Sequence, residues 1–362
     1  MCQGDVERGE AICLCVEKHL GEQVLSLIKK LGCLHKDYLV HRVGEDVCIP
    51  IDERCINSIE QRLPHLGIAY RLTFCSPPRS KSIRRGVNLR TLLKEVLPCE
   101  VVERIPRSFD VVGDIALIEL DPDIAHRYGH IVAEAIMRLQ PRVRAVFARG
   151  ATEGVERVRR LIHIGGENRT QTIHREHGIL IAVDIAKAYF NPSLSTEHAR
   201  VASYVDDHDL VLDLFAGVGP FALHIATRCR AYVVACDINV YALQLLRKSI
   251  ELNRRRIKGF IEPIAIDSIE AIKSYVFREN TFTHIIMNLP HEAPKLSHYV
   301  LRIVSRGGLL HIYGIASSPR DFVSSLEVVR SFRDSIEIVE VVRVLDYAPR
   351  KYIFRATLRR VR

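Results

Sequence analysis

Residues 211–221 read Val-Leu-Asp-Leu-Phe-Ala-Gly-Val-Gly-Pro-Phe, and this stretch decides the fold. An apolar run carries an acid, Asp213, and then breaks into a tight Gly217-x-Gly219 turn, after which a helical pattern covers residues 220–227. Strand, glycine turn and helix in this order are typical of a nucleotide-binding α/β domain. The glycines allow the backbone to approach a ligand closely, and the start of the helix offers free N–H groups.

Acids at the ends of further apolar runs indicate what the ligand is. Asp237 ends the run at residues 232–236, about 20 residues after the glycine turn, where a ribose-binding carboxylate is expected. Asp267 follows the run at residues 260–266, and Asp213 belongs to the first run. These carboxylates suit a cofactor with a ribose and a positively charged amino-acid moiety better than they suit a pyrophosphate. We therefore expect S-adenosylmethionine as the cofactor.

A fourth apolar run, residues 285–287, leads into Asn288-Leu-Pro290. Ligands of such sheets bind beyond the carboxyl ends of the strands, so Asn288 is placed to hold a substrate base or the methionine moiety. Pro290 would stiffen the turn. The third glycine of a dinucleotide fingerprint is replaced by Ala222, which is an allowed variant. A nicotinamide-dependent dehydrogenase is thus a distant alternative, disfavoured by Asp213 and Asn288.

The length and composition limit the classes of protein to which the chain can belong. The chain has 362 residues, 48% hydrophobic and 26% charged, which is enough for two or three domains. No apolar run reaches the roughly 18 residues of a membrane span, and the N-terminus lacks the layout of a signal peptide. We therefore expect a cytoplasmic protein without a membrane partner. The net charge of +9 favours a polyanionic substrate, because neutralising phosphates drives such binding.

Ten cysteines are many for a cytosolic protein. Cys13-Leu-Cys15 is the only close pair, and no C-x-x-C spacing indicates zinc. We expect most cysteines to be buried as small hydrophobes, with a disulfide between two cysteines on one strand face as the alternative. The histidines at His163, His174 and His177 lack acids in a ligand pattern, so we predict RNA contacts or structural roles and no tightly bound metal.

The pattern along the chain predicts three folded segments and a linker. A strand at residues 11–16 and a helix at 20–31 begin the first segment, and alternating strands and helices after residue 210 predict a mostly parallel, doubly wound sheet. The stretch 76–91 carries five basic residues and no acid, and is either a solvated linker or one that also touches phosphates. The expected boundaries are a small α/β domain at 1–75, a basic linker at 76–97, a middle α+β domain at 98–191, and the nucleotide-binding domain at 192–362.

With these residues in view, the chain resembles the archaeal and eukaryotic tRNA (guanine-37 N1)-methyltransferase family. The resemblance implies a small N-terminal domain that checks tRNA shape, a middle RNA-binding domain, and a C-terminal, Rossmann-like class I methyltransferase domain. It also implies tRNA as the partner of a monomeric enzyme. The ordered motifs that carry it span nearly the whole chain: RSFDVVGD from Arg107, GENRTQTIHREHG from Gly166, VDIAKAYF from Val183, LSTE from Leu194, DLFAGVG from Asp213, DIN from Asp237, NLP from Asn288 and YAPR from Tyr347.

The methyl transfer that the resemblance implies needs a general base and a hydrogen-bond donor to guanine O6. Guanine N1 carries a proton at neutral pH, so a general base must remove it while another group stabilises charge developing on O6. The resemblance implies Glu197 as the base and Arg157 as the group that contacts O6, where a guanidinium offers directed donors. Sequence physics alone allows a plainer role, in which Ser195 or Thr196 caps a helix and Glu197 favours its dipole.

The family also implies a set of cofactor contacts. Asp237 would hold the ribose hydroxyls and Asp267 the adenine amine, while Tyr189 would lie close to the cofactor and Phe215 fits either the cofactor cleft or the core. Many family members have arginine directly after the base, whereas this chain has His198, which implies weaker cofactor binding or a pH dependence near about 6.5. The expected cofactor-binding residues are Tyr189, His198, Asp213, Phe215, Gly217, Gly219, Asp237, Ile238, Asp267, Asn288 and Pro290; Glu197, Arg157 and Asn288 are the expected catalytic residues.

Two alternatives remain open at the level of sequence. A relative in the wyosine pathway would use the same cleft to methylate a tricyclic base derived from that guanosine, or to transfer an aminocarboxypropyl group, and one enzyme could do both methylations. The second alternative is a non-catalytic RNA-binding protein with a vestigial cofactor fold. The intact Asp213, Gly217, Gly219, Asp237 and Asn288 argue against that second alternative.

Overall fold

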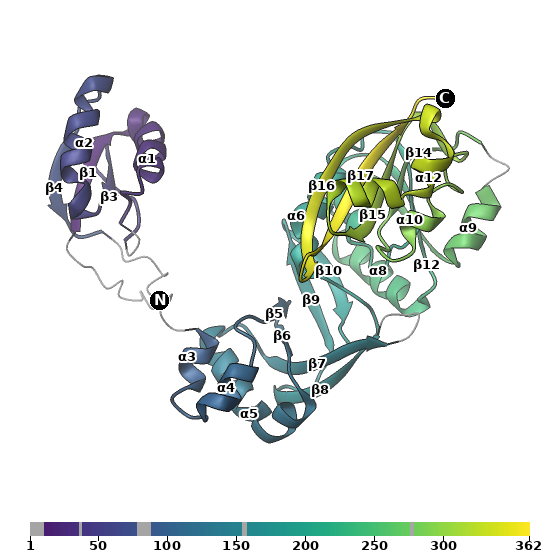
Figure 1. Ribbon diagram of the computed structural model, residues 1–362, viewed down its shortest axis with the longest axis horizontal. Coiled ribbons are helices and arrows are strands. Elements are labelled where there is room, and N and C mark those ends of the chain that lie inside the picture. Colours follow the sequence, from purple (N-terminus) through teal and green to yellow (C-terminus); the bar gives the residue numbers. More distant parts are fainter. Residues whose placement is uncertain (1–10, 36–37, 78–87, 154–157, 276–278) are drawn as a thin grey trace. The chain divides into compact units, whose positions relative to one another are not determined.

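The computed structural model describes residues 11–35, 38–77, 88–153, 158–275 and 279–362 (Figure 1). The chain divides into two compact units, Met1–Leu92 and Leu93–Arg362, which are described separately below. Among the described residues, no helix combines the length and apolar composition that a membrane span requires.

The first unit is a four-stranded antiparallel sheet with helices on one face, with the strand order β2-β3-β1-β4. Leu14 of β1 and Ile49 of β3 face the helices and pack with Ile28 of α1 and Ile59 of α2. Residues next to them in each strand point to the other face, because side chains alternate along a strand. The elements are β1 (Ala11–Glu17), α1 (Gly21–Lys30), β2 (His41–Val43), β3 (Asp46–Pro50), α2 (Ile56–Arg62) and β4 (Arg71–Cys75).

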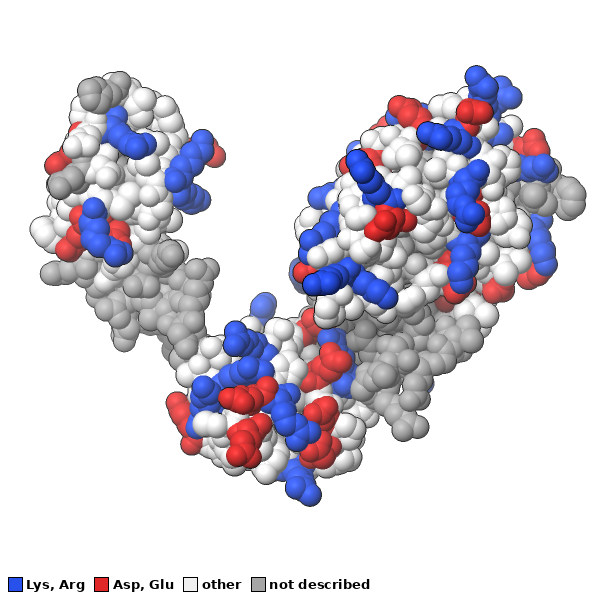
Figure 2. Space-filling view, viewed as in Figure 1, with Lys and Arg blue, Asp and Glu red and all other residues white. Residues whose placement is uncertain are grey.

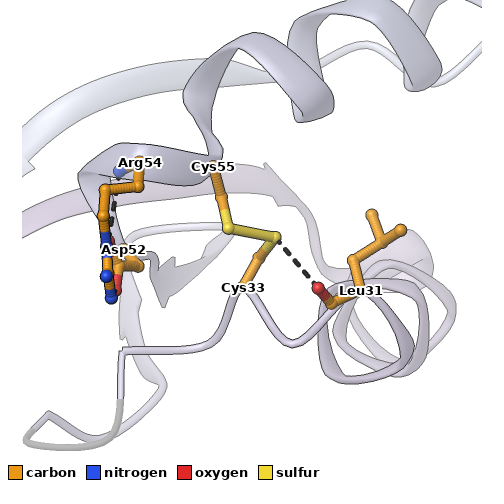
Figure 3. The surroundings of a disulfide bond; sticks show 5 residues. All are labelled: Leu31, Cys33, Asp52, Arg54 and Cys55. Atoms are coloured by element: carbon orange, nitrogen blue, oxygen red, sulfur yellow. Dashed lines mark hydrogen bonds and ion pairs between the residues drawn. A yellow bond between two sulfur atoms is a disulfide. The ribbon is translucent and has the colours of Figure 1, made fainter.

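Two disulfides cross-link this unit. Cys15 of β1 pairs with Cys48 directly opposite it on β3, with their Cα atoms 4.1 Å apart. Cys33, after α1, pairs with Cys55 at the start of α2, and the Cys33 sulfur lies 3.4 Å from the backbone carbonyl oxygen of Leu31 (Figure 3). The expectation that most cysteines serve only as small hydrophobes is therefore wrong for these four, while the alternative of a pair on one sheet face is confirmed.

The second unit begins with a mixed sheet of order β5-β6-β7-β8. Strands β6 and β7 are parallel, and α5 connects them, because parallel neighbours need a crossover. Pro122 occupies the first turn of α5, where its missing N–H costs nothing, and Val132 and Ile136 are buried. Helix α3 (Leu89–Leu93) begins in the last residues of the first unit and ends at the first residue of the second. The elements that follow are α4 (Cys99–Arg104), β5 (Asp110–Val112), β6 (Ile115–Glu119), α5 (Pro122–Leu139), β7 (Ala145–Glu153) and β8 (Val158–Gly166).

Figure 2 shows basic and acidic side chains interspersed over the part of the second unit that contains α4 and α5. Arg104 of α4 illustrates the pairing, since its guanidinium lies 2.8 Å from Asp121 and 3.1 Å from Asp123. On the face shown, the positive net charge of the chain is therefore not gathered here into one purely basic patch.

A seven-stranded sheet forms the rest of the second unit, with the order β13-β12-β11-β14-β15-β17-β16. The first five strands are parallel, and β17 runs antiparallel to both β15 and β16. Numbered along the chain, this is order 3-2-1-4-5-7-6, which confirms the expected mostly parallel, doubly wound sheet. The strands are β11 (Leu210–Asp213), β12 (Tyr232–Asp237), β13 (Phe260–Ala265), β14 (Phe282–Met287), β15 (Val304–Ala316), β16 (Ile336–Ala348) and β17 (Lys351–Arg360).

Helices cover both faces of this sheet. Val211 of β11 points into a core shared with α6, α7 and α8, whereas the next residue, Leu212, points into a core shared with α9, α10, α11 and α12. Both faces are buried, so the strands read as continuous apolar runs. The helices are α6 (Ser195–Ala202), α7 (Pro220–Arg228), α8 (Val240–Leu252), α9 (Ser268–Tyr275), α10 (Ala293–Leu296), α11 (Pro319–Ser325) and α12 (Glu327–Ser331).

A hairpin of β9 (Gln171–Glu176) and β10 (Ile179–Asp184) packs against α8. The amide of Asn253 bonds both backbone groups of Leu180, at 3.0 and 2.6 Å, and Ser249 accepts a hydrogen bond from the backbone N–H of Ala182 at 2.9 Å. Buried polar groups are costly unless they are paired, so these bonds hold the hairpin in one position on the helix. The hairpin thereby delivers Glu176 to the interior of the second unit.

Candidate functional site

A cavity of about 610 Å³ opens at the carboxyl ends of β11, β12, β13 and β14, where doubly wound sheets bind ligands. Its volume lies in the range of small-molecule and cofactor pockets. The structure brings nine of the eleven expected cofactor residues to its wall: Tyr189, His198, Phe215, Gly217, Asp237, Ile238, Asp267, Asn288 and Pro290.

The glycine turn forms one wall and is held by Asp237. The two oxygens of this carboxylate accept hydrogen bonds from the backbone N–H of Gly217, at 2.6 Å, and of Asn239, at 2.8 Å. Gly217 has a φ of +55°, and a Cβ atom there would meet almost nothing, so the turn leaves the cavity open. Gly219, with φ +77°, does not line the cavity; a Cβ there would collide with Leu246 of α8, so this glycine serves helix packing.

Asp213 lies directly behind that turn and is completely buried. Its Oδ1 accepts a long hydrogen bond of 3.4 Å from the backbone N–H of Phe215, and its Oδ2 has no partner among the described residues. Burial raises the pKa of Asp213 to about 7, and the neighbouring Asp237 charge adds to this. Although Asp213 is not itself at the cavity wall, an unsatisfied carboxylate behind a cofactor loop favours a positively charged ligand in front of it.

His198 lies on the cavity wall and is held from behind by Glu176. Its Nδ1 lies 2.8 Å from Glu176 Oε2, and Nε2 of His224 lies 3.1 Å from the same oxygen. Burial lowers the pKa of His198, despite the nearby Glu176 charge, while the two imidazoles outweigh the burial of Glu176 and lower its pKa to about 2. A neutral His198 therefore donates Nδ1–H to a carboxylate, and it does not supply an arginine-like positive charge at neutral pH.

This arrangement corrects one expectation from the sequence. Of the two expectations for His198, weaker cofactor binding or a pH dependence near about 6.5, the second changes, because burial lowers the pKa of His198. The sequence could not show this, since Glu176 and His224 come from β9 and α7, far from His198 along the chain. Their contact depends on how the hairpin packs against the helices.

Glu197 takes part in a second buried network. Its Oε1 accepts hydrogen bonds from the hydroxyl of Tyr313, at 2.9 Å, and from Nε of Arg355, at 2.5 Å. Arg355 is fully buried and also bonds Glu340, so its charge is compensated on two sides. Oε2 of Glu197 faces only Arg200, at 3.6 Å, among the ion pairs of the described residues. The structure does not place Glu197 among the described residues that line the cavity.

Several wall residues were missed by the sequence reasoning. Arg149 of β7 reaches the cavity while bonded to Asp110 at 2.6 Å. Tyr347 and His291 meet at the rim, with 3.3 Å between the Tyr347 hydroxyl and His291 Nε2. The motif that begins at Tyr347 was noticed only as part of the resemblance, and no local pattern marks Arg149 as a site residue. Arg157, the residue expected to contact guanine O6, lies outside the residues that the structure describes.

The fold and this site define the class of protein. A sheet of order 3-2-1-4-5-7-6 carries a glycine turn held by a strand-end acid, an orphaned buried carboxylate oxygen and a cofactor-sized cavity at one edge. These features fit an adenosine-containing cofactor with a cationic amino-acid moiety. The second unit is a Rossmann-like, S-adenosylmethionine-dependent methyltransferase.

Comparison with known proteins narrows the class to a family. The profile of the TRM5/TYW2 methyltransferase domain matches residues 172–342, that of the TYW2 N-terminal domain matches 89–170, and that of the tRNA methyltransferase 5 N-terminal domain matches 13–59. The protein named tRNA (guanine(37)-N(1))-methyltransferase Trm5b of Pyrococcus abyssi is 35% identical, over 92% of this chain and 94% of its own length. This chain belongs to the TRM5/TYW2 methyltransferase family.

Further relatives support the same family assignment. Trm5b of Methanocaldococcus jannaschii is 35% identical over 94% of this chain and 96% of its own. A solved complex of aTrm5 and tRNALeu has a TM-score of 0.65 at 33% identity and covers 97% of this chain and all of that one. A less similar protein, tRNA 4-demethylwyosine(37)-methyltransferase Taw21 of Saccharolobus solfataricus, is 29% identical over 62% of this chain and 83% of its own length.

Proposed function

We propose that this protein methylates N1 of the guanosine at position 37 of tRNA, with S-adenosylmethionine as the methyl donor. The observation that carries the proposal is a cofactor cavity built from the motif residues, in a chain that matches two proteins named for this activity over nearly its whole length. A relative solved with tRNALeu supports tRNA as the partner. We further propose that the enzyme acts as a monomer.

The same comparison supports a proposal for the roles of the domains. We propose that residues 1–75 check the shape of the tRNA, that 76–97 link them to the rest, and that 98–191 bind RNA beside the methyltransferase domain at 192–362. The profile matches at 13–59 and 89–170 support separate N-terminal and middle modules. The β9–β10 hairpin, inside the range proposed for the middle domain, packs on α8 of the methyltransferase domain.

The cofactor would be held by the residues on the cavity wall. Asp237 orients the glycine turn and lines the cavity, where its carboxylate suits ribose hydroxyls; Asp267, exposed at the end of β13, suits an adenine amine. Asp213 would stabilise the cationic end of the cofactor from behind the turn. When bound, the cofactor supplies an electrophilic methyl group, and Asn288 and Pro290 bound the space in front of it.

We propose Glu197 as the general base that removes the proton from guanine N1. Its Oε1 is occupied by Tyr313 and Arg355, which leaves Oε2 as the oxygen that takes the proton. Fixing one oxygen of Glu197 on two buried donors positions the other oxygen. Arg157 is the proposed donor to guanine O6.

A wyosine-pathway activity is the second candidate, and one observation favours it. The profile that matches the middle of the chain is that of the TYW2 N-terminal domain, and Taw21 is a relative. Against it, Taw21 matches only 62% of this chain, whereas the Trm5b proteins match more than 90%. The N1 methyltransferase is therefore the better-supported function.

The test measures transfer of labelled methyl groups to tRNA transcripts with guanosine or another base at position 37, followed by nucleoside analysis. We expect N1-methylguanosine only with guanosine 37, and its loss in Glu197→Gln but not in Glu251→Gln, a control at an exposed position of α8. Label that enters only tRNA with a tricyclic precursor would assign the wyosine activity instead. If the protein does not bind S-adenosylmethionine, both the proposed N1-methyltransferase activity and the wyosine-pathway activity are wrong.

A further inference from the structure

The face of the N-terminal sheet that lies opposite its helices carries a cluster of sulfur and nitrogen ligands. Cys13 and Cys15 lie two residues apart on β1 and share this face, and Cys48 is the cross-strand partner of Cys15 on β3. His41 of β2 is in turn the partner of Cys48, and Cys75 ends β4. Four strands thus contribute soft ligands to one surface of a small sheet.

The ligand atoms lie close enough to share one ion. The sulfurs of Cys13 and Cys75 and a ring nitrogen of His41 lie within 4.8 Å of one another. Cys13 is completely buried, and the buried Nδ1 of His41 has no hydrogen-bond partner among the described residues. A buried, unpaired imidazole nitrogen is costly unless something binds it, and a metal ion beside two sulfurs would do so.

The disulfide does not account for these three residues. Cys15 and Cys48 bind each other, so their sulfurs are occupied, whereas Cys13 and Cys75 are free thiols. Nothing in the proposed methyl transfer uses this face, which belongs to the first unit, whereas the cofactor cavity belongs entirely to the second. Sulfur and imidazole ligands select zinc over magnesium or calcium.

We propose that Cys13, His41 and Cys75 bind one zinc ion, with water in the fourth tetrahedral position. Binding converts both thiols to thiolates and releases their two protons to solvent, so the site with its neutral imidazole carries no net charge. No change of oxidation state is involved, and the Cys15–Cys48 disulfide stays intact. The sequence pattern could not reveal this site, because its ligands come from three different strands.

The position of the site gives the ion a structural role. In the order β2-β3-β1-β4, the strands β2 and β4 are the two edges of the sheet. An ion held by His41, Cys13 and Cys75 would tie both edges to the central β1. Small units bury little apolar surface and commonly depend on disulfides or metals, and this one already contains two disulfides. Zinc should therefore raise its melting temperature.

The experiment uses the full-length protein, stripped with a chelator in non-reducing buffer and titrated with Co²⁺ and then with Zn²⁺. We expect about one Co²⁺ per chain, a near-ultraviolet thiolate-to-cobalt band, visible bands of tetrahedral intensity, and displacement by Zn²⁺. Loss of an outer-shell partner already weakens metal binding about 10–100-fold, so His41→Gln and Cys75→Ser should weaken it by more. Cys99→Ser, at an exposed free cysteine, should bind like the parent.

The test also distinguishes the proposed site from a second cluster of possible metal ligands. Glu176, His198 and His224 could also hold a metal, but they offer no sulfur. Binding without a thiolate band, or binding abolished by His224→Gln and retained in His41→Gln and Cys75→Ser, would overturn the proposal, as would no binding at all. His41→Gln changes a half-buried residue on an edge strand, so near-parental circular dichroism is expected to show that it folds.

Discussion

Replacing Asp213 with asparagine should stabilise the protein, and by more as the pH rises. The pKa of this completely buried carboxyl is about 7, against a reference value of 3.8 for the unfolded chain. Between these two pH values the folded chain retains a proton on Asp213 that the unfolded chain has released. The contribution of this group to stability is therefore fully present below about pH 3.8 and is lost as the pH rises through 7. The difference of about three pKa units corresponds to about 4 kcal/mol.

The magnitude can be followed over an accessible pH range. For the two pKa values above, the free-energy penalty carried by Asp213 grows by about 2–3 kcal/mol between pH 5 and pH 8. The asparagine side chain does not titrate, so the difference in free energy of unfolding between Asp213→Asn and the parent should increase by that amount. A constant offset from altered hydrogen bonds does not affect this slope.

Urea unfolding at several pH values, followed by circular dichroism, measures this difference, since the chain has no tryptophan for fluorescence. Asp334→Asn makes the same substitution at an exposed carboxylate and is the matched control. A flat difference for Asp213→Asn between pH 5 and pH 8 would refute the raised pKa, and with it the claim that the buried oxygen is unsatisfied.

The ionisation of Asp213 should also make the affinity for S-adenosylmethionine depend on pH. If Asp213 stabilises the cationic end of S-adenosylmethionine, the carboxylate must be ionised, and its ionised fraction rises about tenfold between pH 6 and pH 8 for a pKa near 7. Isothermal titration should show affinity rising by that factor in the parent and not in Asp213→Asn. Equal pH dependence in both would mean that Asp213 acts only on stability.

Three further predictions concern the Arg355–Glu197 ion pair, the contact of Glu176 with His198, and the Cys33–Cys55 disulfide. Arg355→Met removes the buried charge partner of Glu197, which keeps Tyr313 and the partly exposed Arg200, and should lower the free energy of unfolding at pH 7 by about 3–5 kcal/mol, with most of the loss returned in the double variant with Glu197→Gln. Glu176→Gln removes the carboxylate charge that faces His198 and His224; the pKa of Glu176, lowered from 4.5 to about 2, predicts a loss of up to about 3 kcal/mol in urea unfolding at neutral pH, shrinking as the pH falls toward 2. Cys33→Ser opens a disulfide that spans 22 residues and should cost the first unit about 3 kcal/mol in non-reducing buffer, with no difference in excess dithiothreitol.

The architecture of the cofactor domain could be predicted from the order of its residues. Continuous apolar runs, each followed by an acid or by Asn288-Leu-Pro290, mark buried parallel strands, because both faces of such a sheet are covered. The position of the cavity followed too, since parallel strands bring their carboxyl ends to one edge. These features are encoded within a few residues of one another, so local pattern suffices to recognise them.

Only the tertiary structure decided which side chains meet. Glu176 reaches His198 and His224 because a hairpin packs on α8, and Arg355 reaches Glu197 from a strand 158 residues away. Sequence spacing carries no information about such contacts, and the pKa of each group is set by burial and by these partners. The motifs thus indicated nine of the residues that line the cavity, while the packing of β9, α6, α7 and β17 determined their partners and which of them face the cavity.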